Sequence, residues 1–134
     1  MRTFIDTSAF YALLDRDDQN HQKAKRAWVE MLEEPPLMVT NNYILVETFA
    51  LLQSRLGLEA VRRFQEDVIP IIQVEFVTPD MHRAGTAALL AAGRRGLSLV
   101  DCVGFEVMRE LGIKVAFTFD SHFKEQGFDV IPSS

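Results

Sequence analysis

The chain has 134 residues, 48% of them hydrophobic and 25% charged, which is typical of one globular domain with a full core. Its net charge is −5, whereas most nucleic-acid-binding proteins have an excess of basic residues. Metal ions bound by clustered acidic residues would nevertheless make the local electric field positive. No apolar stretch predicts a signal peptide or a membrane-spanning helix. The single Cys102 excludes an internal disulfide, so we expect a cytoplasmic protein.

Hydrophobic periodicity predicts that strands and helices alternate along the chain. The predicted strands are residues 1–5, 37–40, 71–77, 114–119 and 128–131. The predicted helices are residues 9–14, 19–33, 41–56, 58–69, 79–95 and 98–111, followed by a short helical turn after Asp120. The predicted helix ends are Pro35-Pro36, Gly57, Gly96 and Gly112. Strands separated by helices favour parallel pairing, so we expect an α/β fold in which a sheet lies between two layers of helices.

Motifs for the commonest cofactors are missing from the sequence. There is no glycine-rich phosphate loop and no dinucleotide-binding fingerprint. The three histidines, His21, His82 and His122, have no ligand spacing, so the sequence indicates no zinc site. The candidate chemistry therefore depends on acidic residues.

Glu47 lies in the most apolar predicted helix. Its neighbours three and four positions away are Tyr43, Ile44, Ala50 and Leu51. A buried carboxylate without a partner costs several kcal/mol, so Glu47 requires a cation or a partner from another element. The alternative is a position on a narrow exposed edge of the helix.

Asp101 follows Ser98 by three residues at the start of a predicted helix. This spacing predicts a capping box, in which Asp101 binds free amides of the first helical turn. The same position also allows Asp101 to face the crevice at the strand ends.

Asp6 and Asp120 each follow an apolar strand and precede a helical pattern, as helix caps do. In open α/β sheets ligands bind beyond the carboxyl ends of the strands. If the two strands are neighbours in a parallel sheet, both acids lie at the same edge, where two unneutralised carboxylates repel each other. Oxygen ligands of this kind favour Mg²⁺ or Mn²⁺, and one or two such ions would support attack on a phosphodiester by a metal-activated water.

Four segments resemble, in order, the acidic motifs of PIN domains, particularly the VapC-type ribonuclease toxins. They are Ile5-Asp6-Thr7-Ser8, the helix with Glu47, Ser98-Leu99-Val100-Asp101 and Phe117-Thr118-Phe119-Asp120-Ser121-His122-Phe123. The resemblance covers essentially the whole chain, residues 1–134, as a single PIN-like nuclease domain. It implies a five-stranded parallel sheet and Mg²⁺- or Mn²⁺-dependent cleavage of single-stranded RNA.

By this resemblance, Asp6, Glu47, Asp101 and Asp120 bind metal and activate water, and Ser8 and Thr118 orient the carboxylates. The resemblance also implies a homodimer and a small antitoxin whose tail blocks the acidic pocket. Arg62-Arg63 and Arg94-Arg95 could contact RNA phosphates, but surface charge is their simplest interpretation.

Two other functions compete with the nuclease. A receiver-type signalling domain also collects acids at the carboxyl ends of a parallel sheet, but it requires paired acids after its first strand and a lysine after its fifth. Here a single Asp6 follows the first strand, and Lys114 begins its strand. A non-catalytic RNA-binding or partner-binding module with the same fold is the second alternative.

Overall fold

The computed structural model describes residues 1–35 and 37–133. In chain order the elements are β1 (Arg2–Ile5), α1 (Thr7–Leu14), α2 (His21–Glu33), β2 (Leu37–Asn41), α3 (Asn42–Arg55), α4 (Leu58–Arg63), the π-helical turn η1 (Phe64–Val68), the 3-10 turn η2 (Ile69–Ile71), β3 (Gln73–Glu75), α5 (Pro79–Ala92), α6 (Leu99–Leu111), β4 (Val115–Phe117), α7 (Ser121–Glu125) and β5 (Asp129–Ile131). The elements predicted from periodicity are therefore present in the expected order.

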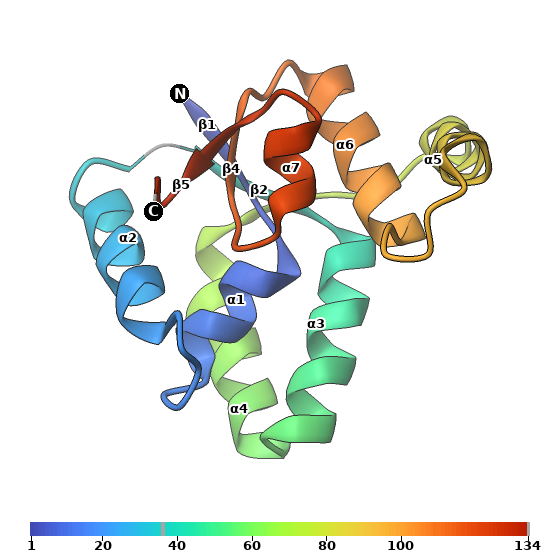
Figure 1. Ribbon diagram of the computed structural model, residues 1–134. Helices are drawn as coiled ribbons and strands as arrows, with labels where there is room; N and C mark the ends of the chain where they lie inside the picture. The colour runs from blue at the N-terminus through green and yellow to red at the C-terminus, as the bar shows by residue number, and fades with distance from the viewer. Residues whose placement is uncertain (36, 134) are drawn as a thin grey trace.

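The five strands form one parallel sheet in the order β3-β2-β1-β4-β5. β1 lies at the centre of the sheet, between β2 and β4 (Figure 1). Ile5 at the end of β1 is opposite Phe117 at the end of β4, and the amide of Asp6 donates to the Phe117 carbonyl oxygen at 3.1 Å. The carboxyl ends of these two strands therefore finish level with each other.

Helices cover both faces of the sheet, as successive residues of β1 show. Phe4 faces α6 and α7, because its ring lies 6.2 Å from that of Phe123 and borders Gly104. Thr3 faces the opposite side and borders a cavity whose other wall is α2. Alternation along the strand thus places one helical layer on each side, and the predicted three-layer α/β fold is confirmed.

Four predicted elements differ from the structure by three or more residues. The helix predicted over residues 58–69 is α for only its first six residues and continues as η1 and η2. Ile71 belongs to η2, which contains Pro70, and β3 covers only Gln73–Glu75 of the strand predicted over residues 71–77. β4 covers only Val115–Phe117 of the strand predicted over residues 114–119. α5 ends at Gly93, which adopts the left-handed conformation with φ 62°, and not at Gly96. Of the predicted stop Pro35-Pro36, Pro36 lies outside the described residues.

α5 approaches α6 closely because Gly85 has no side chain. A Cβ built on Gly85 would lie 2.5 Å from Cγ2 of Val103, so the contact requires glycine. Met81 and Leu89, which are partly buried on α5, pack against the core. This contact fixes the direction in which the chain leaves α5, and the following loop returns it to the start of α6 at the carboxyl edge of the sheet.

Candidate metal centre at the carboxyl edge of the sheet

Asp6 follows β1 and caps α1. Its Oδ2 accepts hydrogen bonds from the hydroxyl of Ser8 at 2.7 Å, from that of Thr118 at 3.0 Å and from the Ser8 amide at 3.4 Å. Asp6 is only 4% exposed. Two hydroxyls from different elements therefore fix this buried carboxylate.

Asp120 follows the end of β4 by three positions and caps α7. Its Oδ1 accepts from the amide of His122 at 2.9 Å, and its own amide donates to Oγ1 of Thr118 at 2.9 Å. Because Thr118 also donates to Asp6, one hydroxyl connects the two strand ends. The Ser8 hydroxyl reinforces the connection by accepting from the amide of Phe119 at 2.9 Å.

Asp101 reaches the same edge from the first turn of α6. The predicted capping box is confirmed: the Asp101 amide donates to Oγ of Ser98 at 3.0 Å, and the Ser98 amide donates to Oδ2 of Asp101 at 3.1 Å. The box fixes the carboxylate against its own helix. Since Asp101 is 9% exposed, it has little freedom to turn away from the edge.

All three carboxylates share one arrangement: each has one oxygen that caps a helix. These oxygens are Oδ2 of Asp6, Oδ2 of Asp101 and Oδ1 of Asp120. Within residues 1–35 and 37–133, the second oxygen of each carboxylate accepts no hydrogen bond. The capping and metal-binding interpretations are therefore compatible, since the cap leaves one oxygen of each carboxylate available for a ligand.

Burial, together with repulsion between neighbouring carboxylates, raises the pKa of Asp6 and of Asp101. Burial raises the pKa of Asp6 to about 6, from 3.8; the hydrogen bonds from Ser8 and Thr118 oppose this rise, and the charges of Asp101 and Asp120 add to it. The pKa of Asp101 is also raised, chiefly by burial, with the charge of Asp120 contributing. A divalent cation would relieve both effects.

His122 belongs to the same cluster, although its spacing in the sequence did not suggest a ligand. One ligand atom from each of Asp101, Asp120 and His122 lies within 4.8 Å of the others. Burial lowers the pKa of His122, but the charge of Asp120 and contacts with Glu125 and the Gly96 carbonyl outweigh it and raise the pKa. The signal in the sequence was its place two residues after the capping Asp120, which turns the imidazole back toward the cap.

Glu47 differs from the other three predicted acids. It is half-buried, and in the described part of the chain it forms no hydrogen bond or salt bridge. The structure thus places Glu47 on a partly open edge of α3, which is the alternative that the sequence left open. Its neighbour Thr48 lies 3.4 Å from Thr7, oxygen to oxygen, so this turn of α3 borders the residue that follows Asp6.

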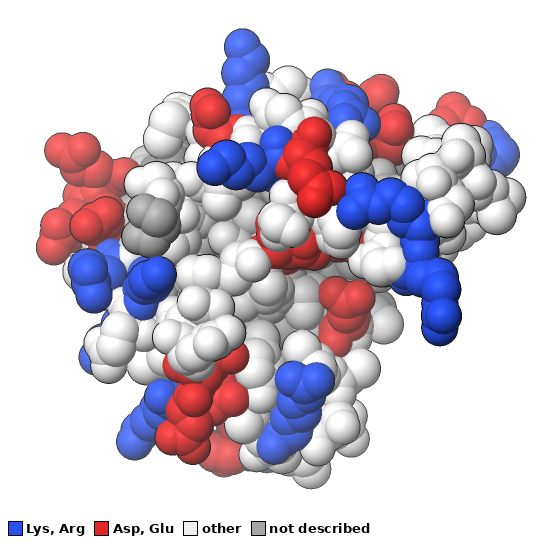
Figure 2. Space-filling model, in the orientation of Figure 1, with Lys and Arg blue, Asp and Glu red and all other residues white. Residues whose placement is uncertain are grey.

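The donor set at this edge fits a divalent cation. Asp101, Asp120 and His122 each offer a ligand atom within 4.8 Å of the others. Asp6 lies outside this group but near enough to be affected by the charges of Asp101 and Asp120, and its Oδ1 accepts no hydrogen bond from the described residues. Carboxylate oxygens are the ligands that Mg²⁺ and Mn²⁺ prefer. In Figure 2 acidic side chains lie at the centre of the face, bordered by basic ones on the side where Figure 1 shows the loop between α5 and α6.

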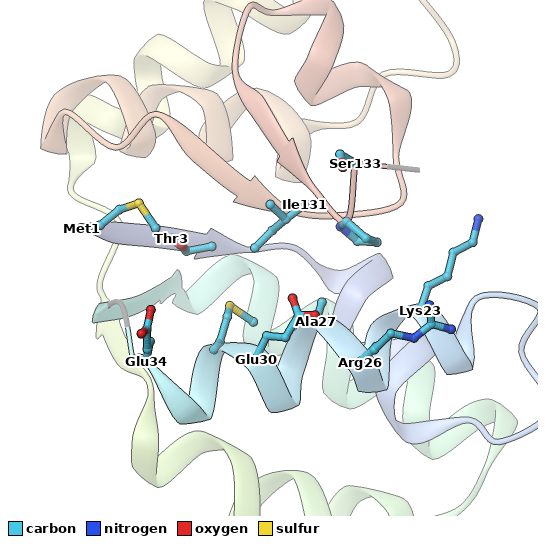
Figure 3. A pocket seen from close by; sticks show the side chains of 11 residues that line it. Met1, Thr3, Lys23, Arg26, Ala27, Glu30, Glu34, Ile131 and Ser133 are labelled. Carbon is cyan, nitrogen blue, oxygen red and sulfur yellow. The ribbon is translucent and has the colours of Figure 1, made fainter.

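A cavity of about 480 Å³ lies away from these acids, between α2 and the strands β1 and β5. In Figure 3 Glu30 and Ile131 point into it, and Lys23 and Arg26 extend toward one end. The hydroxyl of Thr3 is buried there without a hydrogen-bond partner among the described residues. None of the predicted site residues lines this cavity, so it is separate from the acidic cluster.

Residues 3–129 match the PIN domain family, and the chain belongs to that family. It is 37% identical over 126 residues to a Mycobacterium tuberculosis protein named 23S rRNA-specific endonuclease VapC20, covering 93% of this chain and 94% of the relative. The resemblance found in the acidic motifs is thereby confirmed.

Solved structures agree with this assignment. The crystal structure of Mycobacterium tuberculosis VapC20, described as a sarcin-ricin loop cleaving toxin, has a TM-score of 0.84 and 36% identity over 94% of this chain and 95% of that one. VapBC2 from Rickettsia felis, bound to a DNA fragment from its promoter, has a TM-score of 0.71 at 9% identity, over 97% of each chain. The second likeness concerns the fold alone.

The fold also rejects the receiver-type alternative. Receiver-like sheets have the strand order 2-1-3-4-5, whereas the order here is β3-β2-β1-β4-β5. Separately, no helix in the described ranges is long and apolar enough to span a bilayer.

Proposed function

We propose that this protein is a metal-dependent endoribonuclease of the VapC type that hydrolyses phosphodiester bonds in RNA. One observation carries the proposal: three carboxylates from three separate elements meet at the carboxyl edge of the sheet, each with one oxygen tied as a helix cap and the other without a hydrogen bond from the described residues. The 37% identity to a named 23S rRNA-specific endonuclease supports the same activity.

Asp6, Asp101 and Asp120 would hold Mg²⁺ or Mn²⁺, and Glu47 would add a fourth carboxylate from α3. When bound, the ion would supply charge neutralisation for the phosphodiester and lower the pKa of the attacking water. Ser8 and Thr118 orient Asp6 by donating to its Oδ2, which leaves the other oxygen available. Hydrolysis forms a bond between water oxygen and phosphorus and breaks one ester P–O bond, so neither a redox partner nor an organic cofactor is required.

The substrate and partners follow from the family and from the named relative. The relative makes large-subunit ribosomal RNA, and in particular the sarcin-ricin loop, the first substrate to test. Because that relative is described as a toxin, we also infer that this chain is the toxin of a toxin–antitoxin pair, blocked by a small antitoxin protein. A homodimer is the assembly that we propose for it.

The test is cleavage of RNA by purified protein. We expect cleavage of the sarcin-ricin loop with Mg²⁺ or Mn²⁺ and none with EDTA, with activity restored when the metal is returned. Full activity in EDTA would reject the metal mechanism. RNA binding without turnover, over a broad panel of RNA substrates and both metals, would support the non-catalytic module instead.

A further inference from the structure

We propose that the loop of residues 93–98, hereafter the arginine loop, binds the RNA backbone beside the acidic cluster, with Arg95 contacting a phosphate near the scissile one. This inference rests on the proposed ribonuclease function and extends it to a substrate-binding residue.

Contacts with α6 and α7 hold the arginine loop beside the acidic cluster. The His122 ring nitrogen Nε2 lies 3.0 Å from the Gly96 carbonyl oxygen, and Nη1 of Arg94 donates to Oε2 of Glu125 at 3.0 Å. At its end, Ser98 forms the capping box with Asp101. These contacts all go to α7 or α6, the helices that carry Asp120 and Asp101, so the loop is part of the rim of the metal centre.

The loop presents Arg95 at the tip of a turn. The amide of Leu97 donates to the Arg94 carbonyl oxygen at 3.3 Å, which makes Arg95 and Gly96 the central residues of the turn. Leu97 is 5% exposed and anchors the turn in the core, while Arg95 is exposed. Anchoring on both sides of the turn holds the backbone of Arg95 in place and leaves its side chain exposed.

Arg94 and Arg95 differ in the hydrogen bonds and salt bridges that they form. Arg94 forms a salt bridge with Glu125, and its hydrogen bond and its charge both lower the pKa of that carboxylate. Arg95 forms no hydrogen bond or salt bridge with the residues that the structure describes. A cation without a protein partner beside an acidic centre is placed to bind an anion that approaches this centre, and phosphate is the anion that RNA supplies.

RNA approaching the site needs such a cation. The chain carries a net charge of −5, and the carboxylates repel a polyanion wherever bound metal does not screen them. Arg95 would offset this repulsion where the backbone passes the rim. By contrast, Arg62 on α4 is also exposed and without a partner among the described residues, but α4 lies far from the start of α6 (Figure 1).

The experiment measures binding of a fluorescent hairpin RNA as a function of salt, in the Asp101→Asn background that blocks cleavage. Arg95→Ala should weaken binding several-fold at low salt and reduce the slope of log K against log salt by about 0.7 to 0.9, the value of one phosphate contact. Arg95→Lys should retain the slope, because lysine keeps the charge. Arg62→Ala, the matched exposed control, should leave the slope and the affinity unchanged.

Equal slopes for Arg95→Ala and Arg62→Ala would overturn the inference, as would the absence of salt-dependent binding by the parent protein. Cleavage by the unsubstituted protein is measured separately to distinguish the two proposals. An Arg95-dependent slope without any cleavage would reject the nuclease and keep the phosphate contact. Cleavage with an unchanged KM in Arg95→Ala would reject the contact and keep the nuclease.

Discussion

The β1–α1 and β4–α7 junctions both carry an aspartate that caps the next helix, but its environment differs between them. Asp6 follows β1 directly, whereas Asp120 follows the end of β4 by three positions. Asp6 is 4% exposed, and its Oδ2 accepts from two hydroxyls. The side chain of Asp120 is 27% exposed, and its carboxylate accepts a described hydrogen bond only from the amide of His122.

The difference shows how one local motif serves two purposes. A helix cap can be exposed at little cost, as at Asp120, because water solvates the charge. Burial of the same cap at Asp6 raises its pKa to about 6, so ionisation there opposes folding unless a cation is present. Asp6 should therefore gain most from bound metal, and the following predictions test this asymmetry.

The largest expected effect is loss of RNA cleavage in Asp6→Asn and Asp101→Asn. Each substitution removes a carboxylate charge that would hold the metal, so activity should fall by more than the roughly 10–100-fold caused by loss of an outer hydrogen-bond partner. Asp120→Asn should lose less activity, since water can reach this position and replace the carboxylate oxygen as a ligand. Initial rates in Mn²⁺ measure the effect, and circular dichroism verifies the fold; full activity in Asp101→Asn would contradict the metal site.

Thr118→Val should reduce cleavage about 10–100-fold, because it removes the hydroxyl that links both junctions. Thr118→Ser keeps the hydroxyl and should restore most of the activity. Thr86→Val on α5, where the hydroxyl donates to the His82 carbonyl oxygen, is the matched control and should leave the rate unchanged. Equal rates for Thr118→Val and this control would show that the link is not needed.

Asp6→Asn should stabilise the metal-free protein at pH 7.5 by about 1–3 kcal/mol. The pKa of Asp6 is about 6 in the folded state and 3.8 ordinarily, so the native state holds this proton more tightly. Wild-type stability should consequently fall as pH rises from about 4 to 6, and the advantage of Asn should disappear below pH 4. Urea denaturation in EDTA measures the free energy of unfolding of the wild type and of Asp6→Asn as a function of pH. Adding Mn²⁺ should stabilise the wild type more than the variant. A stability difference that does not change with pH would refute the assignment to Asp6.

The smallest effect is expected for Glu47→Gln, about a tenfold loss of Mn²⁺ affinity. Glu47 is half-buried on α3 and is not fixed by hydrogen bonds from the described residues, so it would hold the ion less firmly than Asp6. Calorimetric titration with Mn²⁺ compares the affinities of Glu47→Gln and Asp6→Asn. A loss of Mn²⁺ affinity as large as that of Asp6→Asn would show that Glu47 binds the ion as firmly as Asp6. An unchanged affinity would show that Glu47 is not a ligand.

The sequence by itself determined the order of the elements and the helix caps. Periodicity and capping are local, since they depend on residues within about one helical turn of each other. The capping box of Ser98 and Asp101 and the caps at Asp6 and Asp120 could therefore be predicted before the fold was known. The likeness of the motifs to a known family supplied the rest of the expected site.

Tertiary structure alone decided which of these groups meet. Asp6 and Asp120 share an edge because β1 pairs with β4, a contact between segments more than a hundred residues apart. The exposure of Glu47 depends on which side of α3 the core covers, and the place of His122 depends on where α7 packs against the arginine loop. Long-range packing determines how deeply Asp6 is buried, and burial raises its pKa. No local pattern could therefore reveal that ionising this helix cap opposes folding.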